Sequence, residues 1–158
     1  MIEPYDPKDT IALLDLFYET IHTVNRRDYT KEQINAWAPI DKKAEKRVTW
    51  ERSLLKNSSY IARLNNRIVG FCDMDEDGYV DRLFVHCEFQ GEGIASALLY
   101  QLEKKAKEKQ IGEMRTHASI TATPFFKKRG WLVLREQTVT INDVKLTNYL
   151  MMKKLIDG

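Results

Sequence analysis

The chain has 158 residues, with 25 Lys and Arg against 23 Asp and Glu, a formal net charge of +2, and 43% hydrophobic residues. This length predicts one domain spanning residues 1–158, and the balanced charge argues against a nucleic-acid-binding surface and an acidic disordered tail. No apolar run approaches the ~18 residues of a membrane span, and the N-terminus lacks a signal-peptide pattern. The two cysteines, Cys72 and Cys87, favour a cytoplasmic protein without a disulfide scaffold.

The N-terminal third of the chain predicts helices. The first begins near Asp9, which can cap it, and Thr30 with Gln33 forms a capping-box pattern for a short helix that stops before Pro39. A third helix is expected over residues 43–55. The apolar stripe of the first helix is Ile11, Leu13, Leu14, Phe17, Tyr18 and Ile21. The inward residues of the third are expected to be Val48, Leu54 and Leu55.

The pattern then becomes strand-like. Residues 60–64 and 68–72 form two runs separated by Asn65–Asn66, and asparagine tolerates the positive φ that a two-residue hairpin turn needs. A second turn over residues 75–78 leads into a third strand over residues 79–85. These features predict a three-stranded meander.

The second half of the chain alternates helices and strands. A helix is expected from Gly93 to about Glu108, a strand over residues 113–119, and a short helix over residues 121–129. Residues 132–140 and 144–152 are expected to form a final hairpin across Asn142–Asp143. The order of elements predicts an α/β or α+β single domain with a mixed sheet.

The segment from Leu83 to Ala95 carries the clearest chemical signal. A strand leads into a turn with two glycines, Gly91 and Gly93, and the turn opens a helix. Glycine lets the backbone approach a ligand closely, and the first N–H groups of a helix have no partner within it. The helix dipole favours negative charge at the same point. This segment therefore predicts a site for a pyrophosphate.

Two nucleotide-binding motifs are possible alternatives for this loop. A P-loop needs a Gly-Lys-Ser/Thr ending, which is absent. The dinucleotide fingerprint G-x-G-x-x-G is matched except at Ser96, which replaces the third glycine, and Glu113 precedes its strand instead of following it. A nicotinamide-dependent oxidoreductase therefore stays as an alternative, and it predicts a parallel sheet flanked by helices.

The loop and its surroundings resemble the GCN5-related N-acetyltransferase (GNAT) superfamily. Residues 90–95 are similar to its Gln/Arg-x-x-Gly-x-Gly/Ala motif, and Ala122, Phe126 and Gly130–Trp131 are similar to a downstream block of the family. The resemblance covers about residues 58–153, and residues 17–39 also resemble a bacterial subgroup of YafP-like acetyltransferases. It implies a mixed, mostly antiparallel sheet flanked by helices, with a splayed central strand pair.

The resemblance also implies a cosubstrate, acetyl-coenzyme A (acetyl-CoA). Backbone N–H groups of the loop would hold the pyrophosphate, and the preceding strand would offer hydrogen bonds to the pantetheine arm. Ser119 and Phe126 stand where many members carry an Asn and a Tyr. The expected coenzyme-binding residues are Leu83, Phe84, Val85, Gln90, Gly91, Glu92, Gly93, Ile94, Ala95, Ser119 and Phe126.

The activity that the resemblance implies is acetyl transfer to a primary amine of a small molecule or peptide by direct attack on the thioester. The amine must first lose a proton, so a base is needed. In the family, the Tyr at the position of Phe126 often protonates the leaving thiolate, and a phenyl ring cannot do this. The alternative is therefore a non-catalytic acyl-CoA-binding module.

Four residues are candidates for catalysis. Asp81 is the first candidate base, since counting by two places it on one strand face with Leu83; the alternative is a surface carboxylate paired with an arginine. By the same counting, Tyr79 and Val85 share this face. His22 and His117 lie in parts that approach the acceptor or the thioester in the family. Their alternatives are a histidine at a helix end and a partly buried structural histidine. Tyr149 carries a hydroxyl that can replace the missing one, and its alternative is a structural tyrosine on the last strand.

Other residues are expected to have different roles. Three His and two Cys lack metal-ligand spacing, so no metal is predicted. A Cys87–His86 nucleophile pair is disfavoured, because adjacent side chains on a strand point apart. Tyr29, Trp37 and Trp50 are expected either to wall an acceptor pocket or to serve packing. A homodimer is compatible with the resemblance.

Overall fold

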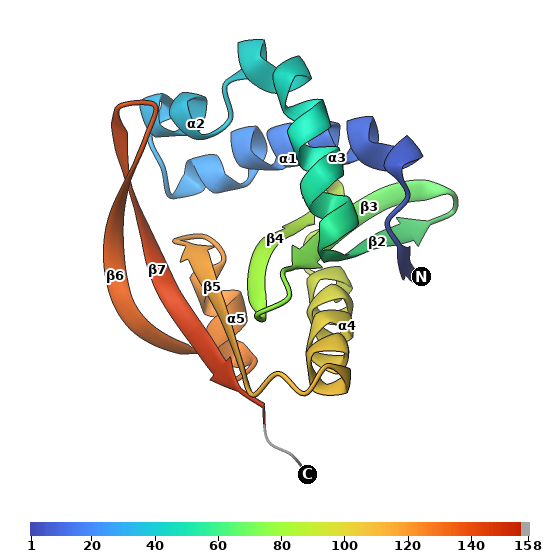
Figure 1. Cartoon of the computed structure of the whole chain (residues 1–158). Helices are drawn as coiled ribbons and strands as arrows, with labels where there is room; N and C mark the ends of the chain where they lie inside the picture. The colour runs from blue at the N-terminus through green and yellow to red at the C-terminus, as the bar shows by residue number, and fades with distance from the viewer. Residues whose placement is uncertain (156–158) are drawn as a thin grey trace.

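A computed structural model of the protein describes residues 1–155 (Figure 1). The helices are α1 (Thr10–Thr23), α2 (Lys31–Trp37), α3 (Lys46–Lys56), α4 (Ile94–Glu108) and α5 (Thr123–Lys128). The strands are β1 (Ile2–Pro4), β2 (Ser58–Leu64), β3 (Arg67–Met74), β4 (Tyr79–Val85), β5 (Glu113–Ser119), β6 (Leu132–Ile141) and β7 (Val144–Lys154). Short 3-10 turns are η1 (Pro7–Asp9), η2 (Asn25–Arg27), η3 (Ile40–Glu45) and η4 (Cys87–Phe89).

The described strands form one mixed sheet in the order β1-β2-β3-β4-β5-β7-β6. Every neighbouring pair is antiparallel except β4 and β5, which run parallel and pair only at Tyr79–Arg115 and Val80–Thr116. The mostly antiparallel sheet with a splayed central pair is thus confirmed. A parallel sheet, which the oxidoreductase alternative requires, is not what these strands form.

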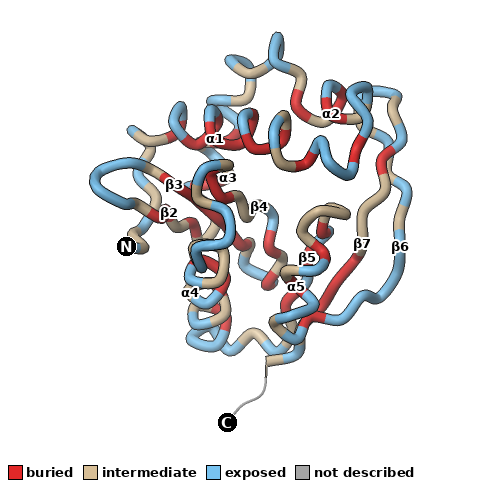
Figure 2. The backbone as a smooth tube through the Cα atoms, turned by 180° about the vertical axis from the view of Figure 1, so that it is seen from behind, coloured by how far each residue is buried: buried red, intermediate tan, exposed pale blue. Residues whose placement is uncertain are grey.

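Helices cover both faces of the sheet, and each face has its own apolar core. On one face, Leu98, Leu99 and Leu102 of α4 pack with buried residues of β3 and β5. On the other face, Leu13 and Ile21 of α1 pack with residues of α3 and the sheet. Figure 2 shows the buried residues of α1 and α4 on the sides of these helices that face the sheet, whereas β6 is mostly exposed.

Several local predictions are confirmed. Asn65 and Asn66 have φ values of 49° and 66°, and Asn142 and Asp143 have 48° and 66°, as two-residue hairpin turns require. The capping box at α2 is complete. Gln33 N donates to Thr30 Oγ1 at 3.1 Å, and Thr30 N donates to Gln33 Oε1 at 2.9 Å.

Other local predictions are wrong for identifiable reasons. Asp9 does not cap α1 with its side chain, because its carboxylate accepts a hydrogen bond of 3.1 Å from Arg63. Val48 and Leu55 are exposed, since α3 packs only through the stripe of Trp50 and Leu54. Ile11 of α1 is exposed as well. Strand β1 was not predicted, because three residues that end in Pro4 show no alternation.

None of the helices within residues 1–155 combines the length and the apolar character needed to cross a membrane.

Candidate active site

Strand β4 has an extra residue at Asp81. The paired positions of β3 and β4 pass from Asp73–Arg82 to Met74–Val80, so Asp81 has no partner and forms a β-bulge. A bulge bends its strand and redirects a side chain. It also breaks the alternation, because Val80 now belongs to the same core cluster as Val85. The prediction that Tyr79, Asp81, Leu83 and Val85 share one face is therefore wrong.

The bulge lies where β4 leaves β5. Val80 and Thr116 are the last paired residues of these strands, and Asp81 follows directly. Two cavities open beyond this point and share Leu83, Phe84, Ser119 and Ala122 in their walls. We call the first the loop cavity; it has a volume of about 320 Å³ and is lined by Gly91 and Gly93. We call the second the aromatic cavity; it has a volume of about 410 Å³ and is lined by Tyr29, Trp37 and Trp50. The two cavities therefore meet where β4 and β5 diverge.

The loop cavity contains the glycine turn. Gly91 and Gly93 have φ values of 76° and 81°, and a Cβ on either would meet no atom within 4 Å. The glycines are thus required by the backbone conformation, while the space beside them stays open. Gly93 is the N-cap residue of α4, and no side chain caps this helix. Its first N–H groups therefore remain available to an anion.

Polar side chains around the loop cavity hold its walls together. Gln90 Nε2 donates a 2.6 Å hydrogen bond to the Val85 carbonyl, and Ser119 Oγ accepts from Ala122 N at 3.1 Å. Arg129 lines the cavity, stacks over the Phe125 ring at 3.9 Å and bonds to Ser96 Oγ. Of the expected coenzyme-binding residues, the cavity wall brings together Leu83, Phe84, Val85, Gln90, Gly91, Gly93, Ile94, Ala95 and Ser119. Glu92 is exposed and lies outside this wall, and Phe126 lines the aromatic cavity instead.

The aromatic cavity lies on the other side of the divergence. Tyr29, Trp37 and Trp50 all line it, and they also pack in the apolar core on this face of the sheet, so both sequence interpretations of these rings stay predictions. The Tyr29 hydroxyl donates to the Thr147 carbonyl at 2.7 Å and accepts from Ile120 N at 2.9 Å, which fixes its ring. Burial raises the pKa of Tyr29. This hydroxyl is therefore a structural link between the segment that joins η2 to α2 and strand β7.

Arg82, which lines the aromatic cavity, forms an ion pair with the buried Asp73. Arg82 Nη1 lies 2.5 Å from Asp73 Oδ2, its Nη2 donates to Ser53 Oγ at 2.6 Å, and its guanidinium stacks 4.7 Å above the Trp50 ring. Asp73 is fully buried and also accepts a 2.9 Å bond from Asn57. Burial raises the pKa of Asp73 to about 6, an effect that the charge of Arg82 opposes.

Two of the four catalytic candidates line the aromatic cavity. Asp81 is 44% exposed and lies 3.6 Å from Arg82 Nη2, which also fits its alternative as an arginine-paired carboxylate. His117 is exposed, and its Nδ1 lies 3.1 Å from the Tyr79 hydroxyl. Burial, together with the charge of Asp81, raises the pKa of Tyr79 to about 12, so Tyr79 keeps its proton.

The other two candidates lie away from both cavity walls. His22 Nε2 is 2.7 Å from the Ala38 carbonyl, so this side chain joins the end of α1 to the end of α2. The Tyr149 hydroxyl donates to Glu136 at 3.1 Å, while its neighbour Asn148 faces the aromatic cavity. Neither placement supports a catalytic role, because both side chains bind elsewhere.

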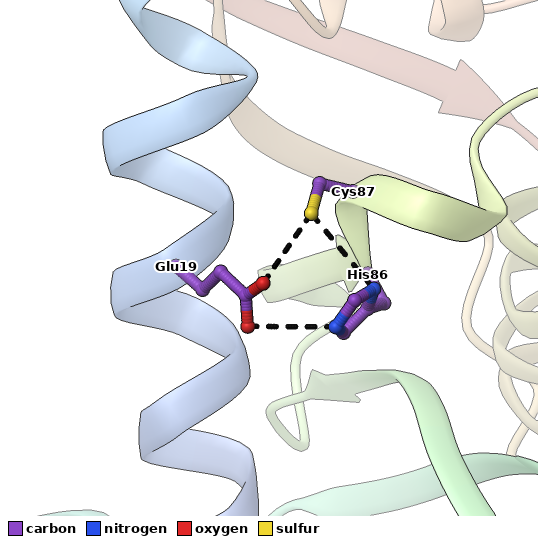
Figure 3. Close-up of side chains that lie close together, drawn as sticks. All are labelled: Glu19, His86 and Cys87. Carbon is purple, nitrogen blue, oxygen red and sulfur yellow. Dashed lines mark hydrogen bonds and ion pairs between the residues drawn. The ribbon is translucent and has the colours of Figure 1, made fainter.

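A separate cluster joins Glu19, His86 and Cys87 (Figure 3). Cys87 Sγ lies 3.4 Å from Glu19 Oε1 and 3.9 Å from His86 Nδ1. The prediction that His86 and Cys87 point apart is wrong, because Cys87 begins the turn η4 and does not continue β4. Burial and the bond to Glu19 raise the pKa of Cys87, which disfavours the nucleophilic thiolate.

The same cluster already contains a positively charged side chain, Arg67. His86 Nδ1 accepts from Glu88 N at 3.1 Å, which places the proton of a neutral ring on Nε2, 3.4 Å from Glu19. The Arg67 guanidinium lies 3.2 Å from His86 Nε2 and 3.2 Å from Glu88. A cation therefore already occupies this position, and the absence of a metal site stays a prediction.

Sequence reasoning missed several residues of the two cavities. Lys46, Arg82 and Asn148 line the aromatic cavity, and Thr20 and Asn25 line the loop cavity. They come from four separate parts of the chain. No short motif contains them, so only their spatial proximity identifies them.

Comparison with known proteins gives a consistent picture. Residues 25–153 match the family model described as the acetyltransferase (GNAT) domain. The chain is 35% identical over 153 residues to the uncharacterized N-acetyltransferase YafP of Escherichia coli K12, covering 97% of this chain and 95% of that protein.

Solved structures agree with this match. A GCN5-related N-acetyltransferase from Rhodopseudomonas palustris, also described as a class-II aminotransferase, superimposes with a TM-score of 0.92 at 31% identity and covers 98% of this chain and 95% of its own. PaiA N-acetyltransferase from Thermoplasma acidophilum, solved with coenzyme A, shares the fold with a TM-score of 0.77 at 21% identity, covering 98% of each chain.

Proposed function

This chain belongs to the GNAT family of acetyltransferases, and from that premise we propose that it transfers the acetyl group of acetyl-CoA to a primary amine of a small molecule or peptide. Its relatives identify it as an N-acetyltransferase and hence an acyltransferase. The observation that carries the proposal is the meeting of the two cavities at Leu83, Phe84, Ser119 and Ala122. One cavity suits a coenzyme, the other an acceptor, and their shared wall suits the reacting atoms.

The loop cavity fits the phosphate end of the coenzyme. The backbone N–H groups from Gln90 to Ala95 are proposed to bind the pyrophosphate, and the left-handed glycines leave room for it. Beyond Val80, β4 has no partner strand on its β5 side. The backbone of residues 83–85 can therefore bind the pantetheine arm as an added strand would. Arg129 adds positive charge to the same wall.

Acetyl-CoA supplies an acetyl group that is activated as a thioester. The chain's own contribution is to orient the acceptor and to remove a proton from its ammonium, since a protonated amine has no free electron pair. Asp81 is the proposed base because the bulge directs it to the aromatic cavity. The new C–N bond replaces the C–S bond, and the thiolate leaves. Phe126 cannot protonate it, so we propose that water passes to this thiolate the proton that the attacking nitrogen loses.

A second candidate function is a non-catalytic acyl-CoA-binding module, and Phe126 favours it. This ring is 3% exposed, packs 5.0 Å from Trp131 and lines the aromatic cavity without a hydroxyl. Both functions predict that acetyl-CoA raises the melting temperature of the protein, whereas NADH does not. Thiol release against a broad amine panel separates them, because only the enzyme produces free coenzyme A.

We also propose one domain over residues 1–158, since the helices of both faces pack on one sheet within residues 1–155. The cytoplasm is the proposed location, supported by the free thiols of Cys72 and Cys87. A homodimer stays a prediction of the family resemblance, and gel filtration with light scattering tests it.

A further inference from the structure

One charged side chain in the wall of the aromatic cavity has no ion-pair partner within residues 1–155. The lysine, arginine, carboxylate and histidine side chains that line it are Lys46, Arg82, Asp81 and His117. Arg82 lies 2.5 Å from Asp73 and 3.6 Å from Asp81, so each of these two carboxylates already has a cation beside it. Lys46 takes part in none of the ion pairs that residues 1–155 form. It is the cation in this wall that lacks a partner within the described chain.

Lys46 is partly buried, so leaving its ammonium without an ion-pair partner has a free-energy cost. Lys46 is the first residue of α3 and is half-buried. Its ammonium lies 5.2 Å from the ring centre of Phe17 and 5.3 Å from that of Tyr18. These ring faces attract a cation, but they replace only part of the hydration that the ammonium loses. Burial accordingly lowers the pKa of Lys46. An anion bound beside Lys46 would supply the partner that the ammonium lacks.

Most of the rest of the wall is apolar, and its uncharged polar members are Thr116, Ser119, Thr147 and Asn148. Its aromatic members are Phe17, Tyr29, Trp37, Trp50, Phe84 and Phe126. Val139, Ile141 and Leu146 add aliphatic surface from the terminal hairpin. A volume of about 410 Å³ suits a small molecule more than a folded protein segment. The body of the acceptor is therefore expected to be small and apolar.

We propose that the acetyl acceptor is a small amine with an apolar body and a carboxylate, and that Lys46 binds this carboxylate. This inference rests on the proposed function and names its substrate class. Lys46 comes from α3 and Asp81 from β4, so the unpaired cation and the proposed base lie on different elements of the cavity wall. An amino acid with an apolar side chain carries the complementary pair of charges.

The test uses acceptors in matched pairs that differ only in the carboxylate. L-phenylalanine, L-leucine and para-aminomethylbenzoate are each compared with the corresponding carboxamide, and thiol release gives kcat/KM. The wild-type protein is expected to prefer the acid of at least one pair by about tenfold or more, as for a hydrogen bond to a charged group. Lys46→Met is expected to remove that preference by lowering kcat/KM for the acid alone. Lys42→Met, at an exposed lysine outside the cavity wall, is the control and should keep it.

A binding measurement decides the proposal without turnover. Titration calorimetry with free coenzyme A present compares the acid and the amide on the wild type and on Lys46→Met. Tighter binding of the acid that disappears in the variant supports the inference. Equal binding and equal turnover of acid and amide in every pair would overturn it while leaving the proposed function intact. If acetyl-CoA binds but no amine on the broad panel releases thiol, the proposed function fails, and the calorimetry alone decides the role of Lys46.

Discussion

The Thr116 hydroxyl donates a 2.8 Å hydrogen bond to the main-chain carbonyl of Val80, at the last pair of residues that joins β4 to β5. Both residues are buried. On one side of this bond the strands pair, and on the other side Asp81 bulges and the two cavities begin. The bond therefore holds β4 and β5 together at the point where they begin to separate.

Thr116→Val should destabilise the protein. Valine keeps the shape and the strand preference of threonine but leaves the Val80 carbonyl without its side-chain partner in a buried place, which costs about 1–3 kcal/mol. Thr140→Val, at an exposed position of β6, is the control and should stay within about 0.5 kcal/mol of wild type. Urea denaturation measures both. Equal stability of the two variants would show that the bond contributes little.

Gly93→Glu should abolish coenzyme binding. At a φ of 81° a side chain costs about 1–2 kcal/mol in backbone strain, while the open space beside Gly93 means that it clashes with no protein atom. The new carboxylate would lie where a pyrophosphate is expected and repel it. Gly112→Glu, where a Cβ also meets nothing within 4 Å, is the matched control. The readout is the melting-temperature increase caused by acetyl-CoA. An increase retained in Gly93→Glu would refute the assignment of the loop.

Asp81→Asn should lower kcat by about a hundredfold or more, because the amide cannot accept the proton of the acceptor amine. The ascending inflection of the pH–rate profile should disappear with it. Asp77→Asn, in the exposed turn between β3 and β4, serves as the control and should leave both unchanged. An unaltered pH profile in Asp81→Asn would exclude Asp81 as the base and leave His117 as the candidate in the same wall.

Asp73 should make stability depend on pH. Its pKa rises from 3.8 to about 6 on folding, mainly because the carboxyl group is buried. Between these values the folded chain keeps a proton that the unfolded chain has lost, so the contribution of Asp73 to stability falls as pH rises from about 4 to about 6. Above that pH the contribution levels off.

Asp73→Asn removes this titration. The free energy of unfolding of the variant, relative to wild type, should therefore increase between about pH 4 and pH 6, whatever the variant loses by leaving Arg82 without its partner. Asp143→Asn, in the exposed hairpin turn, should show no such slope. Urea midpoints measured at intervals across this range give the comparison. A flat difference for Asp73→Asn would contradict the raised pKa.

The parts of the fold that were predictable are those set by neighbouring residues. Thr30 and Gln33 cap α2 through bonds within four residues, and the turns at Asn65–Asn66 and Asn142–Asp143 use residues that tolerate positive φ. Val48 and Leu55 were misplaced, because apolar character does not say which side of α3 meets the sheet. The face of Asp81 was misplaced as well, since a bulge depends on the partner strand and not on β4 alone.

The sequence by itself determined the family resemblance, the glycine loop at the start of α4 and the largely antiparallel sheet, because each depends on short-range backbone preferences or on an ordered motif. Only the tertiary structure decided which side chains share a cavity. Lys46 of α3, Arg82 of β4 and Asn148 of β7 meet in one wall although they are far apart in the chain. Burial then changes their chemistry, since the cost of an unpaired charge depends on the surroundings and not on the residue type.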